Sequence, residues 1–223
     1  AVLEADYIAT GHYAQIERGP DGIVLKKAVD ASKDQSYVLF GMGQQQLSRT
    51  LMPVGAYPKS EIRRMAEDSG LINAAKPDSQ DICFIPSGDY KSFLKKRLTT
   101  TPGDIVEIDG TVVGRHEGIE YFTIGQRRGL GIAEVEPRYV VRIEPESHRV
   151  VVGPEEALMR DEMVVSAVNY PLGFSPQGPV DVNVKIRYKS SEAAAVLHPM
   201  GDGAIVRFSK PQRSVTPGQA AVF

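Results

Sequence analysis

The sequence predicts a chain of the α/β + β class, in which an α/β segment is followed by a longer segment that is almost entirely β. In the first hundred residues, short apolar strand patterns alternate with helical patterns, as at 58–69, where Ile62, Met65 and Ala66 share one face. After a linker-like break at 99–103, short apolar runs recur at regular intervals between turn residues. That spacing is typical of a small β-barrel.

The bulk composition narrows the possible classes of protein. The chain has 223 residues, 42% hydrophobic and 24% charged, which is ordinary for a soluble globular protein of one large or two to three small domains. Its formal charge of −2 gives no overall attraction to nucleic acid, so any RNA binding must come from local basic patches. Cys83 is the only cysteine, which excludes an internal disulfide and fits a reducing compartment. We therefore expect a cytoplasmic protein.

The termini and the apolar runs give two further expectations. No apolar run approaches the ~20 residues that span a bilayer, so we expect no membrane association. The N-terminus lacks the pattern of a signal peptide and does not begin with Met. We interpret the chain as the middle of a longer protein.

The first strand pattern, at 6–10, runs into Gly11 and His12. Ligands of open α/β sheets bind beyond the carboxyl ends of strands, and glycine allows close approach of its backbone to a ligand. Both residues are therefore candidates for a binding site. The alternative is a tight strand exit with a surface histidine. The segments 14–17 and 23–28 flank a Gly-Pro-Asp-Gly turn and predict a β-hairpin.

A polar run at 31–37 precedes a short apolar stretch. Lys33 offers a point charge for a phosphate, and Gln35 can donate and accept at a base edge. The alternative is a solvated loop. Helices are then expected at 41–49 and 58–69, the second with Pro58 at its first position and Gly70 as its stop.

Cys83 lies in the short apolar run 82–85, which follows the turn residues 77–79 and is stopped by Pro86. A thiol in that position is half exposed and half supported, which suits a nucleophile. The alternative is a small buried hydrophobe, and Asp81 would raise the pKa of the thiol if it faced the sulfur. Ser87 can then cap a helix that carries Tyr90 and Phe93 on one face.

The β segment contains two basic motifs. The loop 125–131 has three glycines and the adjacent pair Arg127 and Arg128, and it is either an RNA-backbone contact or a structural turn. The run 185–189 places three cations beside Tyr188, which can stack on a base, or else forms a charged edge strand. Strands are expected at 105–108, 112–116, 138–143, 149–153, 164–169, 180–186, 193–198, 204–208 and 220–223. Asp109-Gly110 predicts a tight hairpin turn between the first two of them, and the next two are expected to form another hairpin.

Several segments together resemble one known family in the right order. They are 9–13 (Ala-Thr-Gly-His-Tyr), 33–37 (Lys-Asp-Gln-Ser-Tyr), 53–55 (Pro-Val-Gly), 78–85 (Asp-Ser-Gln-Asp-Ile-Cys-Phe-Ile), 123–132, 187–188 (Arg-Tyr) and 216–223. The chain resembles the C-terminal two-thirds of the tRNA-specific 2-thiouridylases, the MnmA/TrmU family.

This resemblance implies three domains. Residues 1–86 would be the C-terminal part of an α/β ATP-pyrophosphatase (Rossmann-like) domain, 87–154 a small β-rich central domain, and 155–223 a C-terminal β-barrel. The implied activity is adenylation of the C2 oxygen of the wobble uridine of a tRNA, followed by its replacement with sulfur. ATP with Mg²⁺ would be required, with no resident metal in this part of the protein.

Residue roles also follow from the resemblance, motif by motif. Cys83 would carry the persulfide and Gly11 would lie at ATP. The expected tRNA contacts are His12, Lys33, Asp34, Gln35, Arg187, Tyr188 and Gln219. The implied partners are a tRNA with a wobble uridine and a cysteine desulfurase or sulfur-relay protein.

The family's phosphate loop and first catalytic cysteine have no counterpart here, so we expect the chain alone to be inactive. Two other readings stay open. The β-rich half and its cationic clusters also fit a non-catalytic RNA-binding module of the translation apparatus. A different ATP-pyrophosphatase, acting on a small molecule, would make Cys83 incidental.

Overall fold

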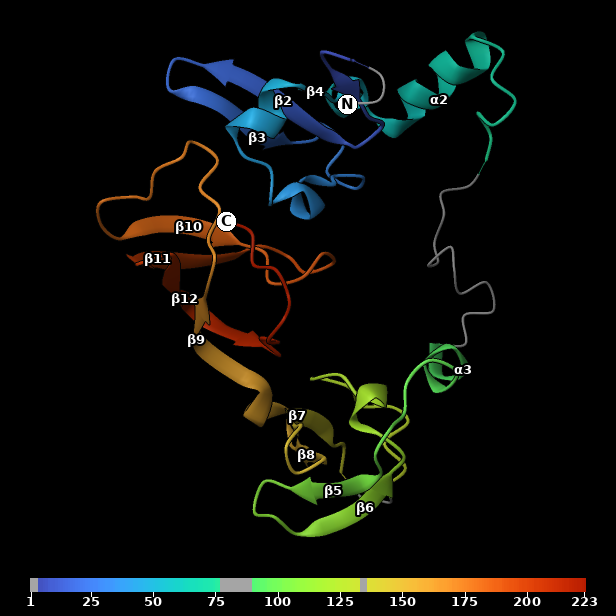
Figure 1. The fold of residues 1–223 in the computed structure, drawn as a ribbon, viewed down its shortest axis with the longest axis vertical. Helices are drawn as coiled ribbons and strands as arrows, with labels where there is room; N and C mark the ends of the chain where they lie inside the picture. The colour runs from blue at the N-terminus through green and yellow to red at the C-terminus, as the bar shows by residue number, and fades with distance from the viewer. Residues whose placement is uncertain (1–3, 77–89, 133–135) are drawn as a thin grey trace. The chain divides into compact units, whose positions relative to one another are not determined.

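The computed structural model describes residues 4–76, 90–132 and 136–223 (Figure 1). Its contacts group into two compact units. The first consists of Ala1–Pro77, Val164–Arg207 and Ala220–Phe223, and the second of Asp78–Met163 and Phe208–Gln219. The three-domain division with boundaries at 86 and 154 stays a prediction.

The N-terminal part of the first unit is α/β, as predicted. Strand β1 (Ile8–Ala9) pairs in parallel with β4 (Thr50–Leu51), and β2 (Ala14–Gly19) pairs with β3 (Gly22–Lys27) in the expected antiparallel hairpin (Figure 1). Helical segments fill the connections: η1 (Ser36–Leu39), α1 (Gln44–Ser48), η2 (Pro53–Ala56) and α2 (Lys59–Asp68). Because β1 belongs to a parallel pair, its carboxyl end opens toward Gly11 and His12, where α/β sheets bind ligands.

Helix α2 shows how local chemistry sets the ends of an element. Pro58 lies one residue before the helix, in an extended conformation with φ −61° and ψ 149°, rather than at its first position. Gly70 ends the helix with φ +70°, where a side chain would be strained, and its N–H donates to the carbonyl oxygen of Glu67. The predicted helix and its glycine stop are confirmed.

The C-terminal β strands form a four-stranded sheet in the order β10-β11-β12-β9. Their bounds are β9 (Met159–Val165), β10 (Val180–Val184), β11 (Ala193–Met200) and β12 (Gly203–Arg213). The barrel prediction is confirmed only in part, because the described pairings give an open order rather than a closed ring. Strand β9 also begins earlier than expected, and 220–223 forms only a bridge between Lys185 and Val222.

The second unit contains a sheet of order β6-β5-β8-β7, in which β5 and β8 are parallel. Its elements are α3 (Tyr90–Lys95), β5 (Gly103–Glu107), β6 (Val112–His116), η3 (Ile119–Tyr121), β7 (Tyr139–Glu144), β8 (Arg149–Gly153) and η4 (Glu155–Leu158). The predicted Asp109-Gly110 turn is confirmed: Gly110 has φ +92°, and the N–H of Thr111 donates to Oδ1 of Asp109 at 2.9 Å.

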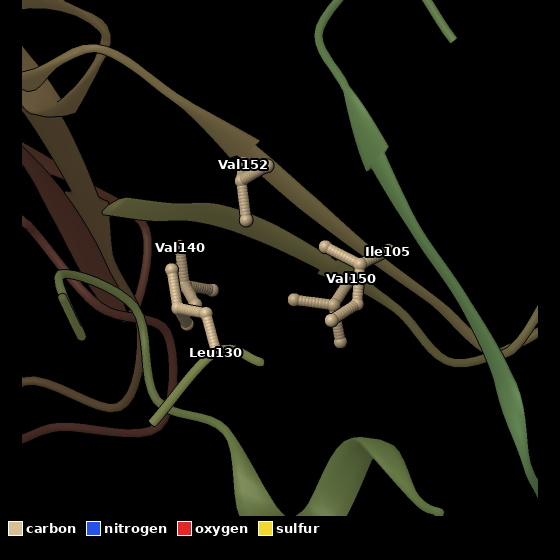
Figure 2. Packing of buried hydrophobic residues seen from close by; sticks show 5 residues of the cluster. All are labelled: Ile105, Leu130, Val140, Val150 and Val152. Atoms are coloured by element: carbon tan, nitrogen blue, oxygen red, sulfur yellow. The ribbon is translucent and has the colours of Figure 1, made fainter. Parts of the chain in front are cut away.

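A hydrophobic cluster fills one side of this sheet. Figure 2 shows its five buried side chains pointing toward a common space: Ile105, Leu130, Val140, Val150 and Val152. Four of them come from β5, β7 and β8, and the alternation of side chains along each strand places them on one face. Leu130 comes instead from the glycine-rich loop, so the core of the sheet holds that loop in place.

His116, at the end of β6, is buried in this unit. Its Nε2 lies 3.1 Å from the carbonyl oxygen of His148, and its ring packs edge-on against Phe122 with centroids 5.3 Å apart. Nδ1 has no partner among the described residues. Burial lowers the pKa of His116 from its ordinary value of 6.5, because the charged ring would lose its hydration inside the protein.

This lowered pKa predicts that stability falls in mild acid. Below about pH 6.5 the unfolded chain binds a proton at His116 more readily than the folded protein does. The free energy of unfolding should therefore fall as the pH drops below about 6.5 and until the lowered pKa of the folded state is passed, by at most about 1.4 kcal/mol per pH unit. Urea unfolding at several pH values measures this slope. A His116→Gln variant keeps an amide donor but does not titrate, so its slope should be shallower. Equal slopes would contradict the prediction.

Candidate nucleic-acid interface

Gln35 ties the polar loop 31–37 to the segment that follows β1. Its backbone N–H donates to the carbonyl oxygen of Tyr13 at 2.8 Å, and its side-chain Oε1 accepts from the N–H of Tyr13 at 2.9 Å. Gln35 and Tyr13 are 22 residues apart in the sequence, so these two bonds bring two of the predicted binding segments together. The second bond engages the amide oxygen of Gln35, so its NH₂ group can act as the donor to an external partner.

Asp34 holds the loop from within. Its Oδ1 accepts the N–H of Ala28 at 2.8 Å, and its Oδ2 accepts the hydroxyl of Ser36 at 2.8 Å. The carboxylate therefore joins the end of β3 to the start of η1. Asp34 thus has a structural role as an acceptor of hydrogen bonds. Its negative charge fits that role better than contact with a phosphate, which it would repel.

We predict that Asp34→Ala lowers the free energy of unfolding by about 1–3 kcal/mol, because the N–H of Ala28 loses its acceptor. Chemical denaturation measures the change. Asp181→Ala is a matched control, since Asp181 is exposed on β10, and it should stay within about 0.5 kcal/mol of the wild type. An Asp34→Ala protein as stable as the control would show that these bonds do not hold the loop.

His12 and Gly11 lie at the exit of β1. Nδ1 of His12 is 2.7 Å from the hydroxyl of Thr10, which fixes the ring and leaves Nε2 for other partners. Gly11 is exposed, and a Cβ built on it would meet no atom within 4 Å. Packing within the described residues thus gives no reason for a glycine at 11, whereas close approach of a ligand to the backbone would.

Within the first unit, Tyr37 joins the same loop to Tyr188, between β10 and β11, and to Ala220 near the C-terminus. Tyr37 is buried, its hydroxyl donates to the carbonyl oxygen of Ala220 at 2.7 Å, and its ring lies 5.9 Å from that of Tyr188. Burial raises the pKa of Tyr37, although the charge of Arg187 opposes that rise. The motif that contains Arg187 and Tyr188 is therefore a neighbour of the loop 31–37.

Cationic groups lie over two of the aromatic rings in this region. The Nζ of Lys185 is 6.0 Å from the ring centre of Tyr188, and the Nζ of Lys59 is 5.1 Å from that of Tyr13. Tyr188 is 42% exposed, so part of its ring remains open to a base. Three residues of this region were not predicted from the sequence as site residues: Tyr13, Tyr37 and Lys59. The two tyrosines stand in the motifs that carry the resemblance, but nothing local marks Lys59.

Two predicted site residues remain, Gln219 and Cys83. Gln219 is exposed, belongs to the second unit, and donates its backbone N–H to Thr216. Cys83 lies outside the described residues. Within the described residues, no three His, Cys, Asp or Glu side chains are grouped so that they could hold a metal ion. None of the described helices has the length and apolar character needed to cross a membrane.

Three family models match consecutive parts of the chain. They describe a tRNA methyl transferase HUP domain at residues 1–87, a tRNA methyl transferase PRC-barrel domain at 91–154, and an aminomethyltransferase beta-barrel domain at 160–223. The tRNA-specific 2-thiouridylases MnmA of Halothermothrix orenii and Pelotomaculum thermopropionicum are each 46% identical over 99% of the chain. That of Rhodospirillum centenum is 48% identical over 99%.

The chain belongs to the MnmA family. The family resemblance predicted from the motifs is thus confirmed. The prediction of an α/β part followed by β-rich parts is also confirmed. This member of the MnmA family spans 63%, 62% and 59% of the lengths of those three relatives, respectively.

Proposed function

We propose that the chain is part of a tRNA-uridine 2-sulfurtransferase, which forms 2-thiouridine at the wobble position, 34, of tRNA. The observation that carries this proposal is the 46–48% identity to three 2-thiouridylases over 99% of the chain. The motif around Cys83 and the cationic and aromatic motifs at 33–37 and 185–188 lie within that similarity.

The proposed reaction has two steps. The C2 oxygen of uracil is a poor leaving group, so ATP first adenylates it and pyrophosphate leaves. The terminal sulfur of a persulfide on Cys83 then attacks C2, the bond from C2 to oxygen breaks, and AMP departs with the oxygen. A second thiol then attacks the sulfur of Cys83, forms a disulfide with it and releases 2-thiouridine, and an external thiol reductant must later reduce that disulfide. The second thiol must come from outside this chain, because Cys83 is its only cysteine.

The chain's own residues fit the binding tasks of this reaction. The open space at Gly11 suits close approach of ATP, which would bring Mg²⁺ with its phosphates. His12, Lys33 and Gln35, which lie in the segments that Gln35 and Tyr13 join, would contact tRNA, as would Arg187 and Tyr188 in the motif beside Tyr37. Gln219 is proposed as a further tRNA contact. Asp34 would act mainly by holding Lys33 and Gln35 in position.

Water must be kept from the adenylated base, since hydrolysis would waste ATP. The wobble base must also leave its stack to reach the reacting groups. The stacking surface of Tyr188 and the cations near it suit the binding of such an unstacked strand. The cytoplasm, where tRNA and a cysteine desulfurase or sulfur-relay protein are present, stays the predicted location.

The test is tRNA thiolation by the whole protein that contains this chain. A tRNA transcript with uridine at position 34 would be incubated with ATP, Mg²⁺, cysteine and a cysteine desulfurase with its relay proteins. Nucleoside mass spectrometry should then find 2-thiouridine only when ATP is present. A transcript with cytidine at position 34 is the matched control. Absence of 2-thiouridine with a donor system that serves another MnmA protein would refute the proposal.

A further inference from the structure

The glycine-rich loop 125–131 of the second unit is held in place by hydrogen bonds within it and to its neighbours, and by packing. The side chain of Gln126 accepts the N–H of Thr123 at 3.1 Å through Oε1 and donates Nε2–H to the carbonyl oxygen of Arg128 at 3.0 Å. Its backbone carbonyl accepts the N–H of Val140 at 2.9 Å, and the N–H of Gly125 donates back to Val140 at 2.8 Å. The side chain of Gln126 and strand β7, through Val140, thus fix the backbone of the loop on both sides of Arg127.

The far end of the loop is fixed by packing. Leu130 is only 6% exposed within the hydrophobic cluster of the sheet (Figure 2). Gly129 and Gly131, on either side of it, both have φ +73°, a conformation that favours glycine and turns Leu130 inward. Arg127 and Arg128 lie between these two anchors and are both exposed. The loop therefore presents two neighbouring guanidinium groups from a fixed backbone.

These two arginines differ from the other arginines of the second unit. Arg115, Arg138, Arg142, Arg149 and Arg213 each pair with a carboxylate, Arg97 lies over the ring of Phe93, and Arg160 donates to backbone carbonyls. In the parts of the chain that the structure describes, Arg127 and Arg128 have no such partner. Two adjacent cations on a fixed loop, with no carboxylate paired to them among the described residues, can form a site for anions.

We propose that Arg127 and Arg128 bind two backbone phosphates of the tRNA, so that the second unit contributes its own contact surface. This inference rests on the proposed function, which supplies tRNA as the polyanion. Arginine matches a phosphate with two parallel N–H donors, and a rigid backbone reduces the conformational entropy lost on binding. Such contacts position an RNA without reading its sequence. The loop would therefore set the register of the tRNA rather than select the wobble base.

The test measures the affinity of the whole protein for a uridine-34 tRNA transcript at several salt concentrations. For the double variant R127A/R128A, the slope of log affinity against log salt should become shallower by about 1.4–1.8, or 0.7–0.9 for each lost phosphate. The affinity at physiological salt should fall at least about tenfold. R127K/R128K keeps the charge and loses the paired donors, so it should retain the slope but bind more weakly.

The double variant R142A/R149A is the matched control. It removes the same charge from the same unit, but both arginines contact Glu144, at 2.8 and 3.0 Å. Its slope should change by less than about 0.5. Thermal unfolding of each variant checks that it is folded.

The outcomes separate this inference from the proposed function. If the wild type binds and thiolates tRNA but R127A/R128A keeps the wild-type slope, the inference is wrong and the function stands. If R127A/R128A binds tRNA as the wild type does but is no longer stimulated by the sulfur-donor protein, the inference is also wrong. The two arginines would then contact that protein instead of tRNA. A wild-type protein that binds no tRNA would overturn both.

Discussion

Replacing Cys83 with serine in the whole protein should abolish formation of 2-thiouridine. A serine hydroxyl cannot carry the sulfane sulfur, and no other cysteine of this chain can replace it. The binding residues are untouched, so the affinity for tRNA should stay within about twofold of the wild type. Single-turnover thiolation and a binding assay on the same preparations separate these two effects.

Intact-mass analysis supplies the direct readout of this role. After incubation with cysteine and a desulfurase, the wild type should gain about 32 Da at Cys83, and the gain should disappear on reduction. Ser79→Ala, four residues earlier, is a nearby control that should keep the gain. If Cys83→Ser still thiolates tRNA, the persulfide role is wrong. Tight tRNA binding without any thiolation by the wild type would instead favour the non-catalytic RNA-binding module.

Replacing Gly55 with alanine should destabilise the first unit strongly. Gly55 is buried in η2, and a Cβ there would overlap the carbonyl oxygen of Ala14, the first residue of β2. The obstacle is backbone rather than a flexible side chain, so relief requires β2 or η2 to move. We expect a loss of about 3 kcal/mol or more, which for a chain of this size lowers Tm by roughly 6–12 °C.

Two other glycines provide matched controls for Gly55→Ala. A Cβ at Gly41 or Gly11 would meet no atom within 4 Å, so alanine at either position should leave Tm nearly unchanged. Gly11→Ala should nevertheless raise the KM for ATP if ATP approaches this backbone. A Gly55→Ala protein as stable as Gly41→Ala would show that the close approach of η2 to β2 is not essential. Unchanged ATP kinetics in Gly11→Ala would remove Gly11 from the proposed ATP site.

Local sequence was sufficient for most of the elements. The 14–27 hairpin, the Asp109-Gly110 turn and the β7–β8 hairpin were predicted from strand periodicity and turn residues, which act over a few neighbouring positions. The 58–69 helix was predicted from its apolar face and its Gly70 stop. Predictions failed where pairing is not local. Residues 220–223 have a strand pattern, but they form only a bridge to Lys185, because an apolar pattern alone does not supply a partner strand.

The candidate site shows the same division. Motifs in the sequence selected Gly11, His12, Lys33, Gln35, Arg187 and Tyr188, since each motif is a continuous stretch of residues with suitable chemistry. Neither the contact between Gln35 and Tyr13 nor that between Tyr37 and Tyr188 could be predicted, because the partners are 22 and 151 residues apart. Asp34 was selected as a tRNA contact, and only the structure showed its carboxylate accepting hydrogen bonds from Ala28 and Ser36.

The sequence by itself determined the family, the order of the α/β and β-rich parts, and the single cysteine available for sulfur chemistry. Each of these depends on residue identity along the chain. Only the tertiary structure decided which motifs share a surface and which cations keep their charge available. Arg127 and Arg142 are the same residue type, so the sequence alone does not distinguish their roles. In the structure, Arg142 lies 2.8 Å from the carboxylate of Glu144, whereas Arg127 has no such neighbour among the described residues. The field of a charge depends on the groups around it, and folding sets those distances.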